Sequence, residues 1–106
     1  MSYDVHLRID TGGAEPVAIT EYHCPTYNLA PMFKYALGFG LRELDGRLAG
    51  VVIHELRRAI AAMQNDPRTF KGLNPPNGWG SYEGALEFLQ NFLKDCLEHP
   101  KATVHI

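Results

Sequence analysis

The sequence predicts an α+β domain in the order β-β-α-α-α-β, with a small three-stranded, mainly antiparallel sheet packed against three helices. Three observations predict it. The first residues alternate in polarity, two long segments repeat apolar residues at three- and four-residue steps, and the last residues alternate again. No composition shift or linker divides the chain, so we expect a single globular domain over residues 1–106.

The first two strands are predicted at the beginning of the chain. Residues 3–9 alternate between apolar and polar side chains, which is the period of a half-buried strand. The segment TGGAEP (11–16) has the glycines and the proline of a hairpin connection, and a second strand follows at about 17–24. Its alternation changes phase midway. Either a bulge or a strand covered on both faces would explain this, and the sequence leaves both open.

A short helix is predicted after this hairpin. Asn28 is expected to be its N-cap, because the side-chain oxygen can accept a hydrogen bond from a free backbone N–H. Pro31 then falls in the first turn, where a missing N–H is tolerated. Gly38 or Gly40 is expected to end the helix.

Two longer helices and a last strand complete the prediction. The second helix, about 48–65, is expected to end at Asp66-Pro67, since the residue before proline is disfavoured in helical geometry. The third, about 82–98, has Ser81 as its predicted cap. Its expected apolar stripe consists of Tyr82, Ala85, Leu86, Leu89, Phe92, Leu93, Cys96 and Leu97. The alternating residues 102–106 are expected to join the sheet beside the first strand.

Composition excludes several classes of protein. The net charge of −2 indicates no broad attraction to nucleic acid or to anionic lipid. No apolar run has the roughly 18 residues of a membrane span, so we expect no membrane partner. The N-terminal MSYDVHLRID has no basic flank followed by an apolar block, so we expect a cytoplasmic protein. Cys24 and Cys96 belong to no CxxC pair, and we expect both to be buried free thiols.

The five histidines do not have metal-ligand spacing. No two of them lie at H-x3-H spacing on a helix, and no acidic residue completes a known ligand set. His6 and His105 are expected to share the open face of the sheet. We therefore predict no metal, no cofactor and no catalytic residue.

The most distinctive segment is NPPNGWGSYEG (74–84), and the loop 74–83 within it is the candidate binding site. Its candidate residues are Asn74, Asn77, Trp79, Tyr82 and Glu83. A tryptophan framed by amides is typical of an interaction surface. Alternatively, Trp79 closes the end of the core while the asparagines bond the loop's own backbone. The two readings can also hold together.

Two further sites are conceivable on the sequence. A small-ligand or enzymatic site could form where this loop meets the sheet, using His23, Tyr22 or Glu83. A basic patch could bind nucleic acid, and its candidate residues are Arg57, Arg58, Arg68 and Lys71. We rank nucleic-acid binding last, because the chain as a whole is negative.

Four segments carry a resemblance to a family: TYNLAPMF (26–33), GLRELDG (40–46), DPRTFKGLNPPNGWGSYEGALEFL (66–89) and HPKATVHI (99–106). Together they resemble small uncharacterised proteins of actinobacteriophages and their actinobacterial hosts. The resemblance implies a phage-type accessory protein and supplies no catalytic residue. We expect a protein-interaction module that binds a host or phage protein. A three-stranded sheet also leaves two edges, so a homodimer formed through a sheet edge stays open.

Overall fold

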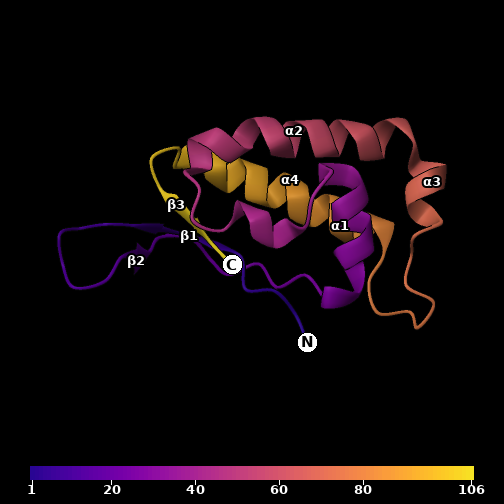
Figure 1. Cartoon of the computed structure of the whole chain (residues 1–106), viewed down its shortest axis with the longest axis horizontal. Coiled ribbons are helices and arrows are strands. Elements are labelled where there is room, and N and C mark those ends of the chain that lie inside the picture. The colour runs from indigo at the N-terminus through magenta and orange to yellow at the C-terminus, as the bar shows by residue number, and fades with distance from the viewer.

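The computed structural model describes all 106 residues and confirms the α+β fold. The strands are β1 (His6–Ile9), β2 (Val17–Ala18) and β3 (Thr103–His105), and they form an antiparallel sheet in the order β2-β1-β3. The helices are α1 (Ala30–Leu37), α2 (Ala49–Asn65), α3 (Pro67–Lys71) and α4 (Tyr82–Glu98), with short 3-10 turns η1 (Tyr27–Leu29) and η2 (Leu41–Leu44) on either side of α1. The sheet and α3 lie at opposite ends of the molecule (Figure 1).

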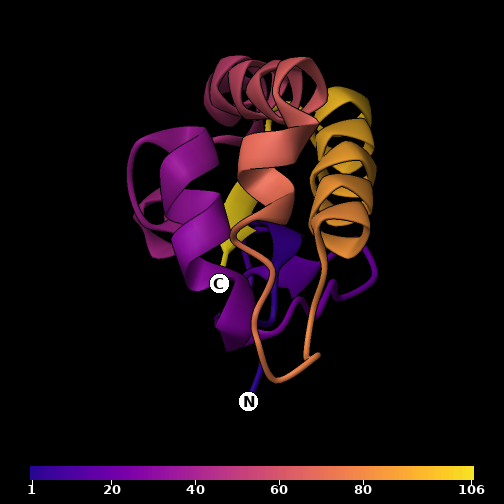
Figure 2. The same ribbon diagram turned by 90° about the vertical axis from the view of Figure 1, so that its right-hand side faces the viewer.

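The helices and the sheet enclose one core. Viewed along the long axis, α1, α2 and α4 surround the core on three sides and the strands close the fourth (Figure 2). The most extensive helix contact is between α2 and α4. A single cluster of 25 buried apolar residues fills the interior. None of the helices has the combination of length and apolar character that crossing a bilayer requires.

The second strand contains the bulge that the sequence left open, but a register shift of two residues does not exchange the two faces, so Tyr22 and Cys24 are exposed. In the pairing of β1 with β2, Arg8 lies opposite Ala18. In the same register Val5 would lie opposite residue 21, but it pairs with His23, so the second strand has two extra residues at this point. At the bulge the N–H of Leu7 donates to the side-chain oxygen of Thr20 at 3.0 Å. A hydroxyl thus replaces a ladder carbonyl, so the backbone donor stays satisfied although the register shifts.

The sheet has one open edge, not the two that were expected. The outer side of β3 is covered by residues 45–48: the N–H of Gly46 donates to the carbonyl of Val104, and the N–H of Val104 donates to the carbonyl of Arg47, both at 2.8 Å. The strand 17–25 has no such cover on its outer side. Any pairing with another chain through the sheet therefore has to use that strand.

The helix start predicted at Asn28 is wrong. Thr26 instead caps the preceding turn η1, and its hydroxyl accepts from the N–H and the side-chain amide of Asn28 at 3.3 and 2.9 Å. The chain first makes the turn η1, so α1 begins at Ala30 with Pro31 in its first turn. Gly38, at a φ of +86°, ends α1 as predicted.

The two long helices lie within one residue of their predicted bounds. The hydroxyl of Ser81 accepts from the N–H of Gly84 at 3.1 Å, which confirms the predicted cap of α4. The short helix α3 was not predicted. Asp66 follows the last residue of α2 and also caps α3, because its carboxylate accepts from the N–H of Thr69 at 3.4 Å.

The buried face of α4 is rotated from the predicted stripe. Phe88 was not included in the predicted stripe but is buried, whereas Leu97 was included and is 46% exposed. The reason is that α4 packs against α2 on one side and against the sheet on the other. Phe88 is buried against Phe33 of α1 and His23, whereas Leu97 lies on the outside.

Candidate functional site

The loop 74–83 is held in place by its asparagine side chains. The carbonyl oxygen of Asn74 accepts from the N–H of Tyr82 at 2.8 Å, and that of Asn77 accepts from the N–H of Trp79 at 2.9 Å. The amide nitrogen of Asn77 also donates to the side-chain oxygen of Asn28, in η1, at 3.3 Å. Both predicted asparagines therefore fix the loop's own conformation.

Two glycines allow the loop to turn and to pack closely. Gly78 and Gly80 have φ angles of +76° and +109°, in the region that favours glycine. A Cβ on Gly80 would lie 2.9 Å from side-chain carbons of both Leu29 and Thr26. The absence of a side chain at Gly80 thus lets the loop lie directly against η1. Gly78 has open space around it.

The loop presents Trp79 to solvent. The residue is 70% exposed, so the reading in which its ring closes the end of the core is wrong. Tyr82 fills that interior role instead: it is buried, and its hydroxyl donates to the carbonyl of Met63 at 2.8 Å. Glu83 is exposed and lies 4.0 Å from the ammonium of Lys71. Of the five candidate residues, Trp79 and Glu83 are thus the ones whose side chains are free to meet a partner.

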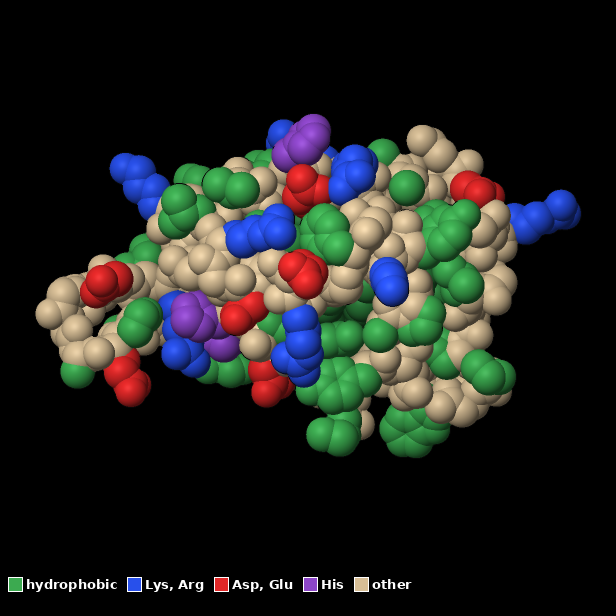
Figure 3. Space-filling model, in the orientation of Figure 1, with side chains coloured by type: hydrophobic (Ala, Val, Ile, Leu, Met, Phe, Trp, Pro, Cys, Tyr) green, Lys and Arg blue, Asp and Glu red, His purple; other side chains and the backbone are tan.

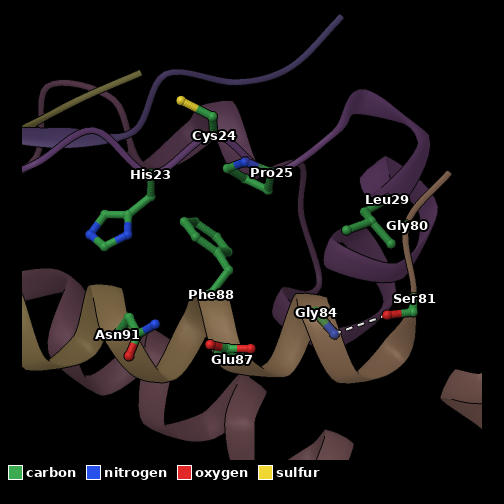
Figure 4. Close-up of a pocket in the computed structure, with 10 residues that line it drawn as sticks. All are labelled: His23, Cys24, Pro25, Leu29, Gly80, Ser81, Gly84, Glu87, Phe88 and Asn91. Carbon is green, nitrogen blue, oxygen red and sulfur yellow. Dashed lines mark hydrogen bonds between the residues drawn. The ribbon is translucent and has the colours of Figure 1, made fainter.

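A groove of about 340 Å³ adjoins the loop (Figure 4). One wall is the strand segment 23–25, and the other is a face of α4 with Gly84, Glu87, Phe88 and Asn91. Ser81, with Gly80 beside it, closes the end next to the loop. The side chains of His23 and Phe88 point into the space between the two walls, whereas that of Cys24 points away from α4.

Three of the side chains around this groove, those of His23, Ser81 and Cys24, already have polar partners. The Nε2 atom of His23 lies 2.6 Å from a carboxylate oxygen of Asp95, and the imidazole meets Phe88 edge-on at 5.9 Å. The hydroxyl of Ser81 serves as the helix cap. The thiol of Cys24, predicted to be buried, is exposed and lies 3.6 Å from the carboxylate of Asp4. Neither the hydroxyl nor the thiol is paired with the imidazole of His23.

The residues of the alternative enzymatic site do not come together. Of its three residues only His23 lines the groove. Tyr22 stacks on His6, with ring centroids 4.0 Å apart, and Glu83 faces Lys71. The structure also contains no cluster of three or more His, Cys, Asp or Glu side chains arranged to hold a metal ion.

A second polar cluster lies on the outer face of the sheet. His6 is only 4% exposed because it stacks between Tyr22 and His105. Its Nε2 accepts from the guanidinium of Arg8 at 2.8 Å, so Nδ1 carries the proton and faces the carbonyl of Asp4 at 3.4 Å. Burial lowers the pKa of His6 below its ordinary value, and the positive charge of Arg8 acts in the same direction. His6 is therefore a neutral imidazole at neutral pH.

Not all of the predicted basic side chains are free of interactions within the chain. Arg58 donates to the carbonyl of Leu37 at 2.9 Å and pairs with the carboxylate of Glu55 at 2.5 Å. Lys71 lies over the ring of Tyr82 and near Glu83. Arg57 and Arg68 remain exposed. On the face shown in Figure 3, Lys and Arg side chains are scattered singly between other side chains rather than gathered in one area.

Comparison with family models, curated proteins and solved structures finds no match. The case for function therefore depends on the geometry of the loop and the groove. The groove was not predicted from the sequence. Two features pointed to it: the irregular alternation in 17–24, and Gly84 within the first turn of a strongly amphipathic helix.

Proposed function

We propose that this chain is a protein-interaction module in which loop 74–83 is the binding element and Trp79 is the anchor. The observation that supports this most is the 70% exposure of a large aromatic side chain on a loop fixed by hydrogen bonds. Trp is among the residues that contribute most binding energy at protein interfaces. A loop that is already ordered also loses little conformational entropy on binding.

The sequence resemblance suggests the setting in which to look for the partner. We infer a phage-type accessory protein that binds a host or phage protein inside an actinobacterial cell. Glu83, exposed next to the anchor, would lie at the rim of the contact, where charge affects the rate of association more than affinity. Tyr82 holds its end of the loop against α2 through the hydrogen bond from its hydroxyl to the carbonyl of Met63.

The test is affinity capture from an actinobacterial lysate, comparing the native chain with Trp79→Ala. Because the indole is exposed, this variant keeps the fold, which circular dichroism checks. The matched control is Tyr35→Ala, which removes another exposed aromatic side chain on α1, outside the loop. A retained protein is then purified and titrated against each variant.

We expect Trp79→Ala to lose the partner and Tyr35→Ala to keep it. Truncation of an anchoring tryptophan weakens binding by about 2 kcal/mol or more, which is roughly 30-fold in Kd. Trp79 is the only tryptophan, so its fluorescence should also shift to shorter wavelength when the partner covers it. A partner with equal Kd for the native chain and for Trp79→Ala would overturn the proposal.

A further inference from the structure

The groove beside the loop has the form of a peptide-binding site, because it lies between an edge strand and a helix. The residues 23–25 form the open edge of the sheet, and α4 runs alongside them (Figure 4). The helix face from Gly84 to Asn91 is about 10 Å long at 1.5 Å per residue. At about 3.3 Å per residue, that length matches three residues of extended chain.

The edge offers backbone groups that have no partner. The N–H and C=O of His23 both bond to Val5, and the C=O of Pro25 accepts from Tyr3. Between them, neither the N–H nor the C=O of Cys24 makes a hydrogen bond. Since the side chain of Cys24 points away from α4, its backbone is the part that lines the groove. A donor and an acceptor are thus presented together, as in strand addition at a sheet edge.

The helix wall has a gap that leaves room for a chain. Gly84 is in the first turn of α4, although glycine is a poorer helix former than alanine. A Cβ there would meet a single side-chain atom, the hydroxyl oxygen of Ser81 at 3.3 Å. The glycine is therefore not required by close packing of the core, and its missing side chain widens the groove.

The charge of the groove selects the occupant. No Lys or Arg lines it, and the carboxylate of Glu87 has no ion-pair partner. Asp95, on the same side of α4, is already paired with His23. A basic side chain is the group that complements Glu87.

We propose that the groove binds an extended peptide segment of a partner protein, which adds a short strand at Cys24 and places a Lys or Arg side chain against Glu87. This inference rests on the proposed function, because it names the chemistry of the partner of the same interaction module. Gly80 and Ser81 belong to both loop and groove, so one partner can contact both surfaces.

The test begins with a displayed library of random heptapeptides selected on the immobilised full chain. Enriched sequences are synthesised with a fluorescent label and titrated by anisotropy. We expect enrichment of Lys or Arg at one position. We also expect an alternating effect of backbone N-methylation: about 10-fold loss of affinity at the residue that pairs with Cys24, and little change at its neighbours. Only strand addition gives that alternation, because successive N–H groups point to opposite sides.

Three variants locate the binding. Gly84→Leu fills the groove and should abolish binding. Glu87→Lys should weaken binding of the basic peptides about 5-fold or more. Glu98→Lys is the matched control, since it makes the same change in net charge on an exposed residue eleven positions further along α4, and it should have no effect. If leucine at position 84 disturbs the cap at Ser81, Glu87→Lys against Glu98→Lys still decides the question.

The outcomes separate this inference from the proposed function. If the peptides bind equally to the native chain, to Gly84→Leu and to Glu87→Lys, binding in the groove is refuted. If those peptides are lost with Trp79→Ala, the loop module still stands. A selection that enriches no peptide also overturns the groove, and the lysate experiment then tests the loop on its own. Concentration-dependent dimerisation abolished by Gly84→Leu would show a second copy of the chain as the occupant, against the proposal.

Discussion

The close contact between Gly80 and η1 predicts an unusually costly glycine-to-alanine substitution. In Gly80→Ala, a Cβ would lie 2.9 Å from carbons of Leu29 and Thr26, at a φ of +109°. The backbone strain is roughly 1–3 kcal/mol. Overpacking adds about 1–3 kcal/mol, so we expect a loss of roughly 2–6 kcal/mol in the free energy of unfolding. Gly78→Ala is the matched control, because its φ is also positive but nothing lies within 4 Å. It should lose only about 1–2 kcal/mol.

Urea unfolding followed by circular dichroism measures both variants. For slopes of about 1–3 kcal/mol/M, a loss of ~3 kcal/mol lowers the midpoint by roughly 1–3 M, and Gly78→Ala should move it less. Adding Thr26→Ser to Gly80→Ala removes one of the two clashing carbons but keeps the capping hydroxyl, so part of the loss should be recovered. Equal losses for the two alanine variants would refute the close packing of the loop on η1.

Three other predictions follow from buried polar groups. Tyr82→Phe leaves the carbonyl of Met63 without its hydroxyl donor, and we expect the free energy of unfolding to fall by about 1–3 kcal/mol in urea titrations. Burial raises the pKa of the Cys96 thiol to about 12, so Ellman's reagent should modify Cys24 alone in the native chain and both thiols in urea, and Cys24→Ser should abolish the native reaction. Folding lowers the pKa of His6, so as the pH falls the imidazole is protonated in the unfolded chain before it is protonated in the folded chain. The contribution of His6 to stability is therefore complete above about pH 6.5 and is lost as the pH falls through its folded pKa. Urea midpoints at about pH 7.5 and pH 5 should differ less in His6→Gln than in the native chain; an unchanged difference would contradict the lowered pKa.

The fold could be predicted where local spacing decides the structure. The apolar residues of α2 and α4 repeat with the helical period, and Ser81 and Asp66-Pro67 are helix signals that depend only on near neighbours. The short helix α3 has too few residues to show a period. The bulge could not be chosen from sequence, because it depends on the hydroxyl of Thr20 reaching an N–H on the neighbouring strand.

The site was less predictable, because it is made by contacts between distant parts of the chain. The loop 74–83 was identified from its composition, but whether Trp79 is buried depends on how Gly80 packs against Leu29, more than fifty residues earlier. The groove joins residues 23–25 to α4 and appears in neither segment alone. A strand pattern shows which faces are apolar. It does not show which edge remains without a neighbour.

The covered outer side of β3 limits how copies of this chain could assemble. A sheet with two free edges can add a molecule at each and grow without end into a filament. Here residues 45–48 occupy one of those edges, so edge-to-edge joining uses the same strand on both molecules and consumes it. Such joining closes at a two-fold pair. The short segment between η2 and α2 thus protects the protein against open-ended polymerisation through its sheet.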